Sequence, residues 1–166
     1  MTKQLRFLVL LAVLVLSAGA GSAFAAFGQP PLSDSTLAVS PTTINEGSGV
    51  ALTFTFTVGS SPASITNGKV EVEAPDGWTF TAASIDTSSC NTSSASASFT
   101  ASEAEVVGLS CATGQTLVLD VTATTPDVSV NTLYSFDGSF KTTAGGRTGS
   151  NVYRVASEPT ITVQAV

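Results

Sequence analysis

The sequence predicts an all-β fold, an antiparallel β-sandwich of about eight or nine strands with Greek-key connections. Short segments repeatedly alternate apolar and polar residues with a period of two, and turn residues separate these segments at roughly ten-residue intervals. No segment after the N-terminal leader shows the 3.6-residue period of an amphipathic helix. A closed β-barrel is the alternative arrangement of the same strands.

Residues 50–58 have the longest apolar face in the chain. One parity carries Val50, Leu52, Phe54, Phe56 and Val58, and the other carries only Ala and Thr. Such alternation places one face of a strand against a core and the other in solvent. We therefore expect this segment to be the central strand of the fold.

The same alternation predicts further strands at residues 36–40, 69–74, 104–109, 116–123, 151–155 and 159–166. Their inward side chains are Val70, Val72 and Ala74, then Leu117, Leu119, Val121 and Ala123, and finally Ile161, Val163 and Ala165. Pro41 lacks a backbone donor, so the first of these strands is expected at a sheet edge or where a strand changes partner. Residues 84–101 are too weakly patterned to assign.

Two dipeptides and one tetrapeptide carry the residues of tight turns. Asn67-Gly68 and residues 74–77 (APDG) are expected to be turns, the second of which brings Trp78 and Phe80 to one end of the core. Asp137-Gly138 also resembles a hairpin turn.

A hairpin at Asp137-Gly138 would put Phe136 and Phe140 on opposite faces, whereas one continuous strand keeps them on the same face as Tyr134. We therefore predict a continuous strand over residues 133–143, with Gly138 at a bulge or close contact and the turn at residues 144–147.

Residues 1–25 have the three parts of a secretory signal peptide. Lys3 and Arg6 precede an apolar run over residues 7–16, and the segment ends in Ala23-Phe24-Ala25, a small-residue cleavage motif. The alternative, a membrane anchor, needs a longer run to span about 30 Å of hydrocarbon. We predict cleavage after Ala25, a flexible lead-in at residues 26–35 and a single domain at residues 36–166.

The mature chain is strongly acidic. Without residues 1–25, four of the six basic residues remain against twelve carboxylates, so the net charge is 4 − 12 = −8. This charge argues against a nucleic-acid partner. No second apolar stretch is long enough to predict stable membrane insertion.

Cys90 and Cys111 are the only cysteines of a chain that is expected to be exported. An intramolecular disulfide is the simplest arrangement, and free thiols or a bond to another chain are the alternatives. The chain-entropy model gives such a loop of about twenty residues roughly 3 kcal/mol of stabilisation.

Several segments together resemble the immunoglobulin-like (Ig-like) repeats of bacterial extracellular and cell-surface proteins. They are SPTTIN at residues 40–45, LTFTFT at 52–57, NGKVEV at 67–72, PDGW at 75–78 and PTITV at 159–163. The resemblance implies an Ig-like sandwich with a spacer, stalk or adhesive role. The chain departs from the antibody pattern because Trp78 precedes both cysteines.

The sequence carries no recognisable catalytic machinery. Histidine is absent and the cysteines are not clustered, so the usual zinc and copper sites and the Ser–His–Asp and Cys–His systems cannot be built. No phosphate-binding glycine motif is present. We assign no catalytic, cofactor-binding or metal residues and predict that the protein is not an enzyme.

Two weaker signals concern an ion and a modification. Asp76, Asp120, Asp127 and Asp137 are the aspartates that could hold calcium at a loop end, although they lack the D-x-D-x-D spacing and are better explained as solvated carboxylates. Asn91-Thr92-Ser93 is an N-glycosylation sequon, meaningful where the producing organism has the machinery.

The leading hypothesis is an exported bacterial, non-enzymatic Ig-like module with a structural, adhesive or protein-interaction role at the envelope or outside the cell. It would act through a protein partner or self-assemble through edge strands, with Thr36–Ser40 and residues 160–166 as the candidate edges. The alternative is a secreted carbohydrate-binding module, whose polysaccharide would stack on Trp78, Tyr134 and Tyr153.

Overall fold

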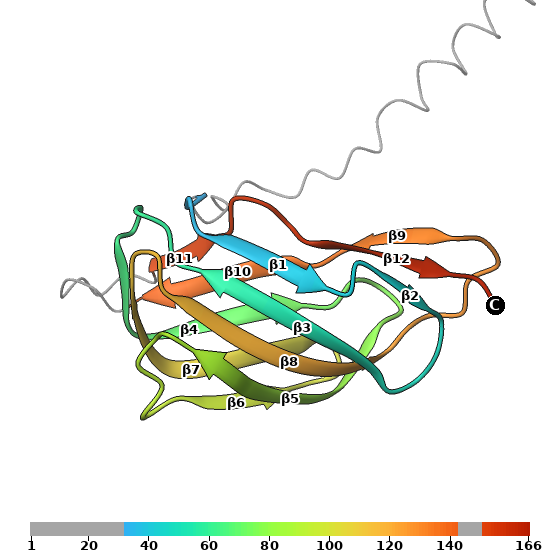
Figure 1. The fold of residues 1–166 in the computed structure, drawn as a ribbon, viewed down its shortest axis with the longest axis horizontal. Helices are drawn as coiled ribbons and strands as arrows, with labels where there is room; N and C mark the ends of the chain where they lie inside the picture. Colours follow the sequence, from blue (N-terminus) through green and yellow to red (C-terminus); the bar gives the residue numbers. More distant parts are fainter. Residues whose placement is uncertain (1–31, 143–150) are drawn as a thin grey trace, which may run out of the picture.

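The structure, a computed structural model, describes residues 32–142 and 151–166, which form twelve strands and no helix. Two of its sheets face each other in a sandwich (Figure 1). The first sheet has the order β1 (Thr36–Ser40), β3 (Val50–Thr57), β8 (Thr116–Thr124) and β5 (Thr79–Ser88). The second has the order β11 (Asn151–Arg154), β10 (Asp137–Thr142), β4 (Ser64–Glu73), β7 (Glu103–Ala112) and β6 (Ser96–Phe99).

A small third sheet extends the sandwich at one end, beside the C-terminus (Figure 1). Its order is β2 (Thr43–Asn45), β12 (Thr160–Gln164) and β9 (Thr132–Ser135). All strand pairs are antiparallel except that between β12 and β2, which is parallel. The predicted antiparallel sandwich is therefore confirmed. In the part of the chain that the structure describes, no helix is long and apolar enough to cross a membrane.

Strand β3 lies inside its sheet, between β1 and β8, as predicted for residues 50–58. Leu52, Phe54 and Phe56 are each only 1% exposed. The ring of Phe54 lies 5.3 Å from that of Phe136, and the ring of Phe56 lies 5.3 Å from that of Phe140. These edge-on or tilted contacts join the two sheets across the core.

Strands β9 and β10 form one continuous run that is interrupted only at Phe136. Its first part pairs with β12 and its second part pairs with β4 and β11. Phe136 and Phe140 are buried and Tyr134 packs against the core, so the predicted continuous strand is confirmed. Gly138 makes the expected close contact, because a β-carbon there would lie 2.7 Å from Cδ2 of Leu37. The turn predicted at residues 144–147 lies outside the described residues.

The Asn67-Gly68 pair was expected to be a turn, and this prediction is wrong. Both residues lie within β4, where the register with β7 shifts on either side of Gly68. Asn67 has a φ of 43°, and a β-carbon on Gly68 would lie 2.2 Å from the carbonyl oxygen of Lys141. The local conformations that suit a turn also suit a β-bulge, and pairing with β7 makes it a bulge.

One of the two candidate edge strands is indeed at an edge. Strand β1 pairs only with β3, and after Pro41 the chain changes sheet, since β2 pairs with β12. The final strand is not an edge, because β12 lies between β2 and β9. The prediction of an edge at residues 160–166 is therefore wrong.

Residues 32–35 pack against the domain, although they were expected to end a flexible lead-in. Ser33 and Ser35 are buried, and the Ser33 N–H donates to the carbonyl of Arg154 (2.9 Å). Asp34 accepts hydrogen bonds from the hydroxyl and N–H of Ser60 and from the N–H of Ser61, and these lower the pKa of its carboxyl to about 2. The ordered domain thus begins before residue 36.

The unassigned residues 84–101 contribute the end of β5 and the whole of β6. A disulfide joins Cys90, which follows β5, to Cys111 in β7, with an S–S distance of 2.07 Å. It is the predicted bond, and it ties the end of the four-stranded sheet to the five-stranded sheet. Polar side chains dominate this region, so a covalent link supplies cohesion that apolar packing provides elsewhere.

We expect Gly138→Ala to destabilise the domain by about 1–3 kcal/mol, because the new methyl group would overpack the core between Leu37 and Val155. Urea denaturation of the disulfide-intact protein measures this change. Ser139→Ala, on the outward face of the same strand, is the matched control and should change stability far less. Equal stability of wild type and Gly138→Ala would contradict the close contact.

Candidate functional site

The outer face of the five-stranded sheet carries five of the twelve carboxylates of the chain, and a sixth lies beside it. Val70 and Val72 of β4 and Ala104 and Val106 of β7 point into the core, so the residues between them point outward. We call this surface the acidic face, and it consists of Lys69, Glu71, Glu73, Glu103, Glu105, Asp137, Lys141 and Arg154, with Glu158 beside it.

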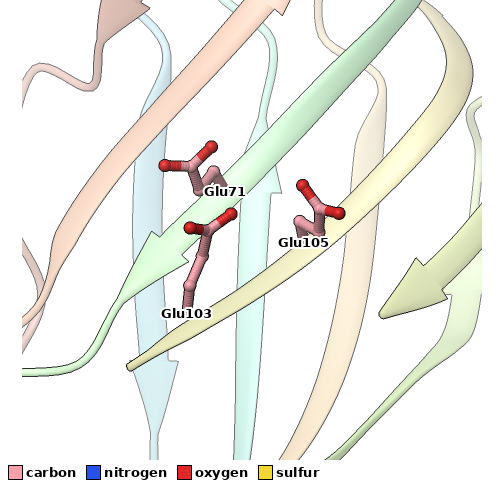
Figure 2. Close-up of side chains that lie close together, drawn as sticks. All are labelled: Glu71, Glu103 and Glu105. Carbon is pink, nitrogen blue, oxygen red and sulfur yellow. The ribbon is translucent and has the colours of Figure 1, made fainter. Parts of the chain in front are cut away.

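Three of these carboxylates converge from two neighbouring strands, as Figure 2 shows. Glu71 of β4 pairs directly with Glu105 of β7, and Glu103 lies two residues before Glu105. Their oxygens lie within 4.8 Å of one another, and all three side chains are partly buried. Like charges placed directly opposite one another destabilise a sheet unless a counter-charge is present.

The counter-charge is the ammonium group of Lys69. Its Nζ lies 2.7 Å from Glu105 and 3.2 Å from Glu103, and it also contacts Glu71. Burial alone would lower the pKa of Lys69, but the hydrogen bonds to Glu105, Glu71 and Glu103 outweigh burial and raise it. The hydrogen bond from Lys69, together with one from the hydroxyl of Ser98, lowers the pKa of Glu105. A protein cation thus already occupies the centre of this trio.

A second group of carboxylates is centred on Glu73, which has no such partner. Asp137 of β10, Glu73 of β4 and Glu103 of β7 lie side by side in register across three strands. Among the described residues, no Lys or Arg nitrogen lies within 4 Å of the Glu73 carboxylate. Burial raises the pKa of Glu73, and the charges of Glu71, Asp137 and Glu103 raise it further. At the centre of the row, Glu73 thus carries a negative charge that no cation among the described residues pairs with.

At the end of this row, Asp137 and Glu158 interact with Arg154. The Arg154 Nη2 lies 2.5 Å from Glu158 and 3.7 Å from Asp137, so the guanidinium favours Glu158. Burial, followed by the hydrogen bond with Glu158, raises the pKa of Asp137, and that bond lowers the pKa of Glu158. Arg154 therefore neutralises the row at Asp137 only in part, because Glu158 shares its guanidinium.

Two shallow hollows lie on the acidic face. The first, of about 250 Å³, is bordered by Glu71, Glu73 and Asp137 together with Ser139, Val152 and Arg154. The second, of about 260 Å³, lies at the β4 bulge and is bordered by Lys69 and Lys141. The face is therefore acidic at one hollow and basic at the other, which is a pattern that can select the orientation of a charged partner.

The four aspartates considered for calcium are not brought together. Asp76 lies in the turn before β5, Asp127 follows β8, and Asp137 begins β10. Asp120, on β8 of the other sheet, accepts a 2.8 Å hydrogen bond from the hydroxyl of Thr53. The one group of three acidic side chains close enough to share an ion, within the described ranges, is the trio around Lys69.

The aromatic residues considered for polysaccharide binding do not form an exposed surface. Trp78 is 5% exposed and packs edge-on against Tyr134 and Phe136, as expected of a core residue. Tyr153 stacks on the ring of Phe140 at 5.4 Å. The three residues therefore contribute mainly to the core, which counts against the carbohydrate-binding alternative.

The residues of the acidic face were not singled out as a site from the sequence. Glu71 and Glu73, like Glu103 and Glu105, are spaced by two, and this spacing puts each pair on one face of its strand. That signal was present, but it does not say that β4 and β7 pair in register. The pairing of β4 with β7 brings the two solvated pairs of glutamates together on one crowded surface.

The chain resembles known proteins in its three-dimensional structure and not in its sequence. No family model and no curated protein sequence matches the chain. Among solved structures, it is similar to the sixth cohesin of Acetivibrio cellulolyticus scaffoldin B, solved in complex with a mutant Cel5 dockerin, with a TM-score of 0.53 and 10% identity over 80% of this chain and 100% of that chain.

It is also similar to BcpA, the major pilin subunit of Bacillus cereus, with a TM-score of 0.50 and 7% identity over 81% of this chain and 41% of that chain. The fold is thus an Ig-like β-sandwich of the kind found in cohesin and pilin domains of bacterial cell-surface proteins. At these identities the likeness concerns the fold alone.

We expect Glu73→Gln to stabilise the protein at pH 7 by on the order of 0.5 kcal/mol, because it removes one charge from the row. The pKa of Glu73 is raised in the folded state, so its contribution to stability falls as pH rises from about 4.5 through that raised value. The gain should therefore vanish near pH 3.5, where the carboxyl is protonated in both states. Thermal unfolding at both pH values measures it.

The control for Glu73→Gln is Asp127→Asn, which makes the same charge change on an exposed residue away from the acidic face. A stabilisation of equal size in this variant would attribute the effect to net charge and not to the row.

We expect Lys69→Met to destabilise the protein at pH 7 by about 1 kcal/mol, since it leaves the three glutamates facing one another without a cation. The loss should shrink in high salt and in acid, where the carboxylates are screened or protonated. Lys141→Met, which also removes one lysine from the face, is the control. A loss at pH 7 no larger than that of the control would show that Lys69 does not neutralise the trio.

Proposed function

We propose that this chain is an exported, non-enzymatic Ig-like module that binds another protein at the cell envelope or outside the cell through its acidic face. The observation that carries the proposal is Glu73, which lies between the carboxylates of Asp137 and Glu103 in a folded sheet with no cation beside it. Such a row weakens the isolated domain. A basic partner would relieve this repulsion on binding.

The chemistry of the partner follows from the charge of the face. A positively charged Lys or Arg side chain would fit the first hollow, between Glu73 and Asp137, where it would supply the cation that Glu73 lacks. Arg154 at the rim and the two lysines near the second hollow would repel a uniformly basic surface. We therefore expect a folded partner with basic groups at one position of its contact surface and acidic or neutral groups at the other.

A second copy of this chain is a poor occupant of the same face. In a two-fold contact the Asp137–Glu73–Glu103 row would face a row of its own sign, and each mature copy carries a net charge of −8 by the count above. Self-association through the β1 edge remains a distinct route. The chain beside that edge is already occupied just before β1, where the Ala156 N–H donates to the carbonyl of Ser35 (2.8 Å).

The leader-like residues 1–25 and the Cys90–Cys111 disulfide support export. The Ig-like fold shared with cohesin and pilin domains is consistent with a non-enzymatic role, and a cohesin was solved bound to its dockerin. That partner belongs to the cohesin and is not carried over to this chain.

Zero-length carbodiimide coupling on cells that make the protein tests the proposal, because it joins carboxylates to lysines that are already in contact. We expect cross-links from Glu73 or Asp137 to a lysine of another protein, and we expect their yield to fall several-fold between about 50 and 500 mM salt. The double variant Glu73→Gln/Asp137→Asn should abolish them. Asp76→Asn/Asp127→Asn, with equal charge loss elsewhere, should keep them.

Cross-links confined to Lys69 of the same chain, or found only between copies of the chain, would contradict binding through this face. Sedimentation velocity of residues 26–166 separates the routes, because a monomer whose sedimentation coefficient is independent of concentration excludes self-assembly through β1.

A further inference from the structure

The sequon Asn91-Thr92-Ser93 lies on the surface, in the connection between β5 and β6. Its first residue is held firmly, since Asn91 and Ser110 exchange two backbone hydrogen bonds of 2.8 and 3.1 Å. The adjacent Cys90 is fixed by its disulfide to Cys111. Asn91 therefore stands at a defined position on the molecule although the surrounding connection is irregular.

The hydrogen bonds of Asn91 determine which atom of its amide faces solvent. The backbone N–H of Ser93 lies 3.1 Å from Oδ1, and the hydroxyl of Ser93 lies 2.8 Å from it. A backbone N–H can only donate, so the atom it meets must be the amide oxygen. Nδ2 then points away from Ser93, and no acceptor among the described residues binds it.

We infer that Asn91 is an acceptor of an N-linked glycan, attached through Nδ2. The side chain of Asn91 is exposed, the Ser93 hydroxyl that a sequon requires is next to it, and Nδ2 is available. Of the five asparagines of the chain, Asn45, Asn67, Asn131 and Asn151 lack a Ser or Thr two residues later. The inference rests on the export in the proposed function, since glycan transfer of this kind occurs on exported chains.

The donor would be a lipid-linked oligosaccharide activated by a phosphate or pyrophosphate at its anomeric carbon. A bond forms between Nδ2 and the anomeric carbon while the bond from that carbon to the phosphate oxygen breaks. The lipid phosphate leaves with the electron pair, and Nδ2 loses one proton to a base of the transferase. No oxidant or reductant is needed.

The location of Asn91 suggests what the glycan would do. Residues 87–102 carry no charged side chain, and β6 in this stretch is the last strand of its sheet, with Phe99 46% exposed. Edge strands usually carry charges or prolines that prevent other strands from pairing with them. A hydrophilic glycan just before β6 would supply that protection at the free edge of the five-stranded sheet, where β6 pairs with β7 on its other side.

The test is the mass of the protein purified from the organism that makes it. After reduction, cleavage after glutamate releases residues 74–103 as one peptide, which contains the sequon and no other asparagine. We expect this peptide to carry the mass of one oligosaccharide on Asn91. Asn91→Gln and Ser93→Ala should lose the added mass completely, whereas Thr92→Ala, which keeps the sequon, should retain it.

An unmodified peptide on protein that lacks residues 1–25 would overturn the glycan while leaving export intact. An unmodified peptide on protein that retains residues 1–25 would overturn both the glycan and export. Added mass that maps to serine or threonine, and that persists in Asn91→Gln, would also overturn the assignment.

Discussion

The contact between the phenylalanines of β3 and those of the β9–β10 strand holds the two sheets together. Phe54 meets Phe136 and Phe56 meets Phe140, each at 5.3 Å between ring centres. Since Phe136 and Phe140 point inward, Asp137, between Phe136 and Gly138, must point outward. The packing of the core therefore places this carboxylate beside Glu73 and, through β4, beside the glutamates of β7. The charged surface is a consequence of the apolar one.

The acidic face contains two different solutions to the same electrostatic problem. The trio of Glu71, Glu103 and Glu105 is neutralised from within by Lys69, whereas Glu73, at the centre of the neighbouring row, has no cation within 4 Å among the described residues. A sheet selected for stability alone would not need such a row, because Gln or Thr would fit those outward positions without repulsion. Recognition of a basic group is the role that we propose for these carboxylates, because it would make use of a charge that the isolated domain does not need.

Local pattern was sufficient for the strands with strong alternation and insufficient where tertiary pairing chooses between equivalent local structures. The parities of β3, β8 and β10 followed from spacing, and the continuous β9–β10 strand followed from the requirement that Phe136 and Phe140 share a face. The Asn67-Gly68 dipeptide is compatible with both a turn and a bulge, and it forms a bulge because β4 pairs with β7 on both sides of it. Strand β12 looked like an edge because its covering strand, β2, has three residues and no clear pattern.

The sequence by itself determined the fold class, the core residues, the disulfide partners and the excess of negative charge. These depend on composition and on side-chain alternation, which each segment carries independently of the others. The tertiary structure alone decided that two Glu-x-Glu segments and Asp137 lie in register on one sheet, and that Lys69 pairs with Glu71, Glu103 and Glu105 but not with Glu73. Register depends on contacts between residues far apart in the chain, such as Glu73 with Asp137, and no local pattern encodes such contacts.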